Sequence, residues 1–430
     1  IMSVYSQGVK TRDVDPNTFN QSIATFKLPA NAVLYPNLRL FNIGCSDPAN
    51  TGKLYNQVAG CYSLLKNIVL TSQGMEIDAC RNVNRYLAFT QFNNSNENNL
   101  CVEALESKNN FGFEYSVTNS VQVHGVDSTA VVNVQPASSN GYLDLRKALP
   151  ILNNIAVLPT NILKNLVLTI EFELDSLVVV KNPGINLVVE RPILIYDQVD
   201  DPAKALQLEK AFQGVVWNKI EHDQISVASN ADAGAANGIT AASKEQVIAQ
   251  RLEMFSNKFI SRMLVSKMFQ DKSVTLAKHT GNLGSIACNL EKFNVKVDGA
   301  RIFPADIEKE NTRLALLCDA YGEINMPPYG NNATVGLDDP HVNAVNVIGV
   351  HKLLNDKQGK FVGNLAYYGF ALNSKVQDVE INFSRTSLQV ATAAEQPNNP
   401  SLAALNIHAF AEVRKALSVQ KDGSFRVGYL

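Results

Sequence analysis

Few side chains in this sequence have the types and spacing that catalysis or metal binding requires. His222 lies between Glu221 and Asp223, a grouping that could supply a general base or hold a metal ion. Three adjacent side chains on one segment do not easily converge on a single point. We therefore interpret this tripeptide as a solvated turn that follows Trp217.

Two further groups suggest ligand binding, but only weakly. His341 lies beside Asp338 and Asp339, but a calcium ion needs about six or more oxygen ligands. The segment 281–285, Gly-Asn-Leu-Gly-Ser, lacks the lysine and the preceding strand of a phosphate-binding loop. The sequence also contains no Gly-x-Ser-x-Gly nucleophile motif. We therefore predict no catalytic site, no metal site and no cofactor.

The cysteines suggest no metal site and no disulfide scaffold. They are Cys45, Cys61, Cys80, Cys101, Cys288 and Cys318, and no two of them have Cys-x-x-Cys spacing. Structural zinc requires four clustered ligands, and disulfide scaffolds have a denser set of cysteines. We expect reduced and mostly buried thiols.

The composition is that of a globular protein with enough apolar material for large cores. Hydrophobic residues make up 46% of the 430 positions and charged residues 18%. The 38 basic and 40 acidic residues give a net charge of −2, so no broad cationic surface for nucleic acid is expected. We see no signal peptide pattern and no uncharged apolar run of roughly 18 residues, and we expect a soluble protein made in the cytosol.

Short strands separated by turn residues are predicted over most of the chain. Leu64–Thr71 and Met75–Ile77, for example, flank Ser72-Gln73-Gly74 as a hairpin. Two sets of strands, one before about residue 200 and one after about residue 280, favour β-sandwiches or jelly rolls. The other predicted strands are 22–28, 37–43, 111–117, 121–126, 131–134, 166–174, 177–180, 185–195, 294–303, 344–350, 366–372, 376–383, 407–413 and 424–430.

Helices are predicted at 83–92, 143–152, 202–214 and, longest of all, 243–268. Ser243 and Gln246 fit a capping box, and an apolar stripe follows them, while residues 228–242 suit an exposed loop. We expect the long helix to pack on the second half of the chain. A trimer contact, or contact with a neighbour or an internal membrane, stays an alternative.

The order of several segments resembles that of a known family. Residues 64–78, 141–150 and 193–199 are followed by Tyr-Gly-Phe-Ala-Leu at 368–372 and Ile-Asn-Phe-Ser-Arg at 381–385. Together they resemble double jelly-roll major capsid proteins of the polinton-like virus, virophage and nucleocytoplasmic large DNA virus lineage. The chain departs from the family pattern at 228–280.

The resemblance implies a mainly β protein with two tandem eight-stranded jelly rolls side by side. We place the first at 1–200 and the second at 201–430, with a helical insertion at about 228–280. Such a protein would be a structural, non-enzymatic subunit that forms homotrimeric, pseudo-hexameric capsomers of an icosahedral shell. Its partners would be further copies of itself, penton and minor capsid proteins and, as an open alternative, an internal membrane, without sequence-specific nucleic acid. It would reside in the virion capsid after assembly in the host cytoplasm or nucleus.

Two motifs supply the candidate functional residues, either as subunit-interface positions or as family motifs. We expect Phe383 to lie in the core and Arg385 to lie in an interface or a buried ion pair. The candidates are Leu143, Asp144, Leu145, Asn382, Phe383, Ser384 and Arg385.

Other functions stay open on the sequence alone. One alternative is a minor capsid protein. Another is a receptor-binding β-sandwich of the particle surface, such as a lectin, which would need an aromatic cluster or a cation site on one loop face. The single tryptophan, Trp217, argues against sugar stacking. A glycoside hydrolase would need two carboxylates facing each other across a cleft.

Overall fold

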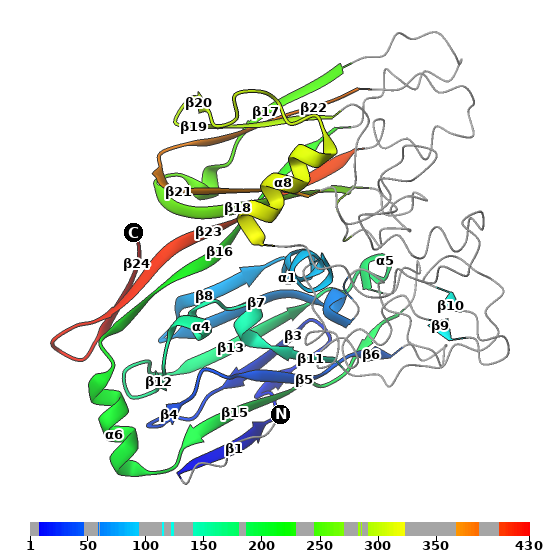
Figure 1. The fold of residues 1–430 in the computed structure, drawn as a ribbon. Helices are drawn as coiled ribbons and strands as arrows, with labels where there is room; N and C mark the ends of the chain where they lie inside the picture. Colours follow the sequence, from blue (N-terminus) through cyan, green and yellow to red (C-terminus); the bar gives the residue numbers. More distant parts are fainter. Residues whose placement is uncertain are drawn as a thin grey trace.

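Two β-sandwiches, stacked one above the other in Figure 1, make up most of the structure, which is a computed structural model. It describes residues 8–46, 59, 61–93, 114–115, 122–123, 141–179, 186–228, 245–270, 283, 285, 291–322, 367–386 and 404–430. Outside these ranges lie the predicted strands at 131–134 and 344–350, the group at 338–341, Cys101, Cys288 and all but single residues of 228–242 and 281–285.

The first sandwich consists of two antiparallel sheets. One sheet contains β1 (Val9–Val14), β4 (Val33–Leu34), β5 (Arg39–Ile43), β11 (Gly141–Asp144), β12 (Leu158–Pro159) and β15 (Ile193–Val199). The other contains β2 (Thr18–Phe19), β3 (Ile23–Lys27), β7 (Leu65–Ser72), β8 (Met75–Arg81) and β13 (Leu166–Phe172). Two short pairs join β6 (Cys45–Ser46) with β14 (Val188–Val189), and β9 (Glu114–Tyr115) with β10 (Gln122–Val123).

The strand β13 shows how the sequence forms this sandwich. Its residues alternate between buried and half-buried along all seven positions, so Leu166, Leu168, Ile170 and Phe172 face the core. The predicted hairpin between β7 and β8 is confirmed. Gln73 and Gly74 both have positive φ, as a two-residue hairpin turn of type I′ requires.

The second sandwich has the same two-layer arrangement. One sheet contains β16 (Gly214–Val227), β18 (Lys258–Phe269), β21 (Tyr368–Val376), β23 (Leu405–Val419) and β24 (Phe425–Tyr429). The other contains β17 (Glu245–Arg251), β19 (Lys292–Val297), β20 (Ala300–Arg301) and β22 (Val379–Thr386).

The prediction of a helix at 243–268 is wrong. The described part of this segment forms β17, a 3₁₀ turn at Glu253–Phe255, and β18. Asn257, at φ 59°, bends the chain into β18. The sheet of β18 is covered on both faces, so its apolar residues run continuously instead of alternating, and such a run resembles a helical stripe. The helical insertion expected at about 228–280 is therefore absent from the described residues 245–270.

Adjacent residues of β18 contribute to different cores. Leu264 pairs with Phe410 of β23, and both belong to the apolar cluster of the first sandwich. Met263 and Val265 belong to the cluster between the two sheets of the second sandwich. Because neighbouring residues of a strand point to opposite faces, this sheet is shared between the two cores.

The shorter helices follow local signals in the sequence. α6 (Pro202–Ala211) leads from β15 to β16, and the Asp201 carboxylate accepts from Ala203 N at 2.9 Å, which confirms the predicted start. α1 (Val83–Leu87) continues as a π-helix over Ala88–Asn93, so the helix predicted at 83–92 is present. The segment 143–152 is only partly helical, with a 3₁₀ turn at Leu145–Lys147 and α4 (Ile151–Asn154). The strand predicted at 177–180 is wrong, since Ser176–Val179 forms α5.

The helix α8 (Glu310–Tyr321) packs on β21 (Figure 1), and its Leu317 and Tyr321 belong to the apolar cluster of the first sandwich. Gly369 permits this close approach. A Cβ atom at that position would lie 2.3 Å from Cδ1 of Leu317 and 3.2 Å from the ring of Tyr321. The glycine of the Tyr-Gly-Phe motif therefore has a packing role.

Candidate functional site at the junction of the two sandwiches

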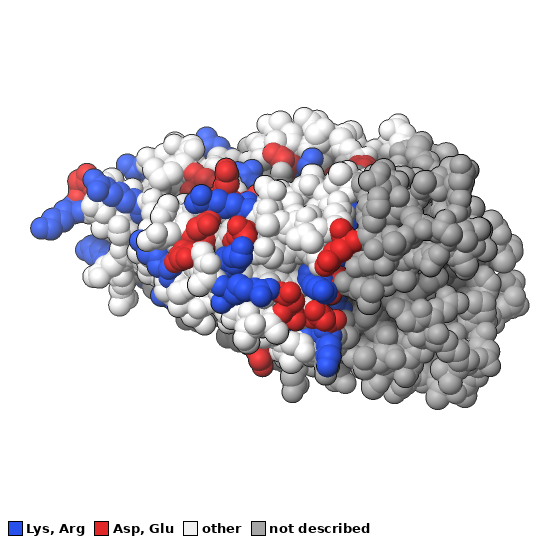
Figure 2. Space-filling model, turned by 90° about the horizontal axis from the view of Figure 1, so that it is seen from above, with Lys and Arg blue, Asp and Glu red and all other residues white. Residues whose placement is uncertain are grey.

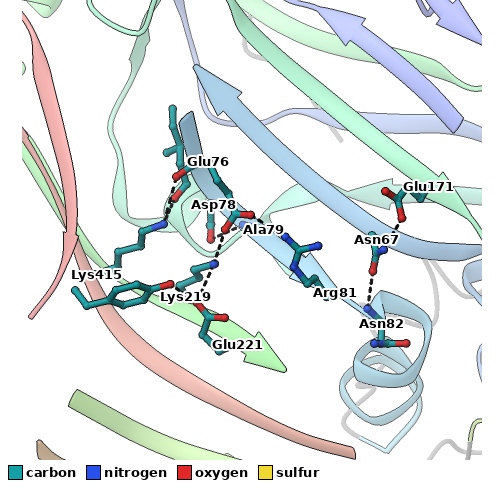
Figure 3. A network of polar contacts seen from close by, with 12 residues as sticks. Asn67, Glu76, Asp78, Ala79, Arg81, Asn82, Glu171, Lys219, Glu221 and Lys415 are labelled. Carbon is teal, nitrogen blue, oxygen red and sulfur yellow. Dashed lines mark hydrogen bonds and ion pairs between the residues drawn. The ribbon is translucent and has the colours of Figure 1, made fainter. Parts of the chain in front are cut away.

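The junction between β8 and β16 holds the most extensive charged network of the described residues. Each is a terminal strand of its own sheet. In Figure 3, Lys219 of β16 bridges Glu76 of β8, at 2.6 Å, and Glu221, at 2.8 Å. The Tyr429 hydroxyl of β24 donates to Glu221. One lysine thus connects strands of both sandwiches.

Mutual attraction keeps these three groups charged although Lys219 and Glu221 are buried and Glu76 is half-buried. Lys219 is only 4% exposed. Burial favours the neutral form of each group, but Glu221 and Glu76 outweigh it and raise the pKa of Lys219. In turn, Lys219 holds the pKa of Glu76 and of Glu221 below the ordinary value despite burial. The network is therefore a fixed ionic link between the sandwiches.

Asp78 and Lys415 form the second part of the junction. The Asp78 carboxylate, completely buried, accepts from Ile151 N at 2.9 Å and from Ala79 N at 3.0 Å. Burial raises the pKa of Asp78 to about 7. Lys415 Nζ donates to the carbonyl oxygen of Ile77 at 2.8 Å, and burial together with the charge of Lys219 lowers its pKa to about 8. Both groups therefore titrate closer to neutrality than usual.

His222 is also part of the junction, so the prediction of a solvated turn there is wrong. It lies in the middle of β16, with its Nε2 3.0 Å from Nδ1 of His408 and the two rings stacked. Asn82 of the first sandwich lies 3.2 Å from its Nδ1. Burial lowers the pKa of His222 to about 4 and that of His408 well below its ordinary value. Both imidazoles are therefore neutral at physiological pH, and the stacked pair is a polar contact between the two sandwiches.

A groove of about 660 Å³ opens beside the junction. One wall is the segment from Asp144 to Asn154, which includes the 3₁₀ turn and α4, and the other is the first half of β16. Tyr86 and Trp217 form its buried base. The groove is therefore a surface to which both sandwiches contribute.

The structure places the predicted motif residues in two separate regions. Leu143 and Leu145 are fully buried in the first core, and the Asp144 carboxylate caps the 3₁₀ turn by accepting from Arg146 N at 3.0 Å. On β22, Phe383 is a core residue of the second sandwich, Ser384 is 6% exposed, and Arg385 is completely buried. Arg385 donates to Gln246 Oε1 at 2.8 Å and to the carbonyl oxygen of Ala228 at 3.0 Å. A subunit contact by the half-exposed Asn382 stays a prediction.

Neither a metal cluster nor a membrane-spanning helix is found within the described ranges. No three or more His, Cys, Asp or Glu side chains are arranged there to hold a metal ion. No helix among these residues is long and apolar enough to cross a bilayer. The described thiols, Cys45, Cys61, Cys80 and Cys318, are free cysteines, and the first three are buried as expected.

Solved structures define the class of fold. No protein-family model and no curated protein matches this sequence. Several virus capsid structures match it over nearly their whole length. The architecture is the double jelly roll of those capsid proteins, which confirms the fold class that the motif order predicts.

Three of these structures show the extent of the likeness. PBCV-1 VP54, fitted into a reconstruction of the virophage Sputnik, matches with a TM-score of 0.55 at 11% identity, covering 98% of this chain and 97% of its own. The mavirus major capsid protein matches at 0.53 and 11%, covering 97% and 90%. The Faustovirus major capsid protein matches at 0.51 and 8%, covering 98% and 92%.

Sequence reasoning missed the central residues of the junction. Asp78 stands at the end of the family-like segment 64–78, but its contact with α4 joins positions 73 residues apart. Lys219 and Lys415 lie in strands that carry other charged residues, Glu221 and Asp223 in β16 and Glu412 and Arg414 in β23, so neither lysine stands out in the sequence. The sequence does not indicate which partner each lysine has.

Proposed function

We propose that this chain is the structural subunit of a viral capsid, in which three copies form a pseudo-hexameric capsomer. The observation that carries the proposal is the double jelly roll itself, shared with major capsid proteins along almost the entire chain. Two sandwiches in each chain give six in a trimer, so a three-fold assembly approximates six-fold symmetry. Penton and minor capsid proteins would complete the shell around these capsomers.

The junction supports such a role. The shared core and the Glu76–Lys219–Glu221 link hold the two sandwiches in one orientation, as a tiling unit requires. The surface seen in Figure 2 has basic and acidic residues interspersed over its described part. A shell subunit of this kind would contact its neighbours directly and would not bind nucleic acid through a cationic field.

Two measurements test this function. Size-exclusion chromatography with light scattering should give trimers of the 47.0 kDa chain, and electron micrographs of assembled material should show a pseudo-hexagonal lattice. A stable monomer that binds glycans saturably would instead support a receptor-binding protein of the particle surface. A trimer that assembles only together with another shell protein would indicate a minor capsid role.

A further inference from the structure

We propose that the outer edge of β24 pairs with the same strand of a second copy of this chain, antiparallel and two-fold symmetric about Val427. This contact deepens the proposed shell function by naming a surface that joins copies, and it rests on that function only for its place between neighbouring capsomers. It depends on the backbone of β24, on the order of its side chains and on the apolar residues at its end.

β24 presents unused backbone hydrogen-bonding groups along its outer edge. In an antiparallel ladder, alternate residues direct their N–H and C=O groups to the partner strand. Leu430 N donates to Arg414 O at 3.2 Å, and the register between the two strands is regular, so the even-numbered residues of β24 pair with β23. Phe425, Val427 and Tyr429 therefore direct their backbone groups away from β23.

Within the described part of the chain, that edge has no neighbour. β24 pairs with β23 alone, and no other described helix or strand lies alongside it. The hairpin of these two strands projects from the left side of the molecule in Figure 1. β24 also contains no proline, no lysine and no bulge, which are features that protect natural sheet edges from pairing. Its edge is therefore a template for an added strand.

The order of side chains in β24 favours a second copy as the occupant. Antiparallel pairing centred on Val427 places this residue opposite its own copy. Each Phe425 then lies opposite a Tyr429 of the other strand, as an aromatic cross-strand pair. Each Arg426 lies opposite a Gly428, so no charge directly faces a like charge. This register also pairs every outward backbone group of both strands.

The neighbouring registers are less favourable. Centring the pair on Arg426 sets two guanidinium groups directly opposite each other, which is destabilising. Centring it on Gly428 places Phe425 beyond the end of the other β24, so its outward groups lose their partners. A Cβ atom at Gly428 would meet no atom within 4 Å, so the register centred on Val427 has room there for the arginine of a second copy.

Exposed apolar side chains lie at the end of β24. Tyr429 is 43% exposed, Leu430 48% and Met254 46%. Lys258 Nζ lies 4.2 Å above the Tyr429 ring and donates to Met254 O at 2.7 Å, so Met254 lies beside the same end of the strand. Pairing sets Phe425 of the second copy against Tyr429, which removes apolar surface from water.

The symmetry of this contact suits a link between capsomers. A two-fold contact is isologous, because the same surface serves in both copies, whereas a three-fold capsomer is held by heterologous contacts. Adjacent capsomers on a hexagonal lattice are related by two-fold axes. The β24 edge would therefore join one capsomer to the next.

Cysteine cross-linking of the full chain tests the register. Val427→Cys places a thiol opposite its own copy at about 5.5 Å between Cα atoms, a separation that a disulfide spans. The matched control is Ser424→Cys at an exposed position, because Ser424 would lie opposite Leu430 and its two copies would be about 20 Å apart. We expect at least about fivefold more cross-linked pairs from Val427→Cys than from Ser424→Cys or from the original chain under the same oxidation.

A proline variant tests the backbone pairing. Val427→Pro removes one outward N–H, and a sheet edge tolerates proline where the N–H faces outward, so the fold should persist. Sedimentation at increasing concentration should show at least about tenfold weaker pairing than for Val427→Ala, which keeps that N–H. Should Val427→Pro fail to fold, the cross-linking comparison decides alone.

Two results would overturn the proposal. They are equal cross-linking of the Val427→Cys and Ser424→Cys proteins, which would mean that β24 does not face its own copy, and equal association of the Val427→Pro and Val427→Ala proteins. Trimers that do not pair through β24 would refute this contact and leave the shell function standing. Cross-linked pairs from a chain that forms no trimers would support the contact and refute the trimeric capsomer.

Discussion

Lys415 donates from its ε-ammonium to the carbonyl oxygen of Ile77 at 2.8 Å, across a separation of 338 residues. Ile77 lies in β8, the terminal strand of its sheet, and it has no partner residue in β7 because the register shifts between Leu70 and Thr71. The lysine therefore supplies a donor that an adjacent strand would otherwise provide, and it does so from the other sandwich. This contact joins the first and the last parts of the fold.

Replacing Lys415 with methionine should loosen this junction. The variant leaves the carbonyl of Ile77 without its donor, so we expect the free energy of unfolding to fall by about 1–3 kcal/mol. Denaturant titration followed by the fluorescence of Trp217, the single tryptophan, measures this loss. The matched control is Lys421→Met at an exposed turn, and an equal effect of the two variants would contradict the role of Lys415.

Asp78 should make the stability depend on pH. Its pKa is 3.8 ordinarily and about 7 in the folded chain, so the folded state binds a proton more tightly than the unfolded state does. The folded protein therefore loses stability as the pH rises from about 4 to about 7. Asp78→Asn stays neutral, so its stability relative to the original chain should increase by roughly 3–5 kcal/mol over that range.

Unfolding titrations of both proteins at several pH values between 4 and 8 test this expectation. Glu253→Gln, at an exposed position, should follow the pH dependence of the original chain. Parallel curves for the Asp78→Asn protein and the original chain would show that Asp78 does not carry the effect.

The buried ion pair of the second sandwich should be sensitive to the loss of one partner. Lys267 Nζ lies 2.7 Å from both carboxylate oxygens of Glu291, and the lysine is only 1% exposed. Glu291→Gln leaves that ammonium without a full counter-charge, so we expect a loss of about 3–5 kcal/mol. In the more exposed pair Lys296–Glu380, at 2.8 Å, Glu380→Gln should cost less than about 1 kcal/mol. Equal losses in thermal or chemical unfolding would contradict this account.

Gly369 should not tolerate a larger side chain. Gly369→Ala forces α8 away from β21, because the added methyl group would overlap Leu317, and we expect a destabilisation of about 1–3 kcal/mol. Gly428→Ala, where no atom lies within 4 Å of the added carbon, should change stability by less than about 0.5 kcal/mol. The melting temperatures of the two variants test this prediction, and equal values would contradict the packing role of Gly369.

The sequence predicted features that depend on local signals. Asp201 before Pro202 identified the start of α6, and Gln73-Gly74 identified the hairpin. The order of the family-like segments predicted the double jelly roll. The segment 243–268 was misassigned because Glu, Gln, Ala and Arg in β17 favour helix, and because burial on both faces of β18 removes the alternation of a strand.

The candidate site was much less predictable than the fold. Leu143, Leu145 and Phe383 are core residues whose types indicate burial. The contacts of Lys219 with Glu76 and of His222 with His408 join residues 143 and 186 positions apart, so no local pattern encodes them. Only the folded arrangement of both sandwiches brings these groups together.

The sheet shared by both cores has a consequence during synthesis. The first apolar cluster includes Trp217, Leu264, Phe410 and Leu417, all from the second sandwich. At about 5–20 residues per second, a ribosome needs roughly 10–45 s to extend the chain from Val199 to Leu417. During that interval all residues of the first sandwich have been synthesised. The side chains of the second sandwich that cover its core have not. We therefore expect nascent chains to need a chaperone until the last strands emerge.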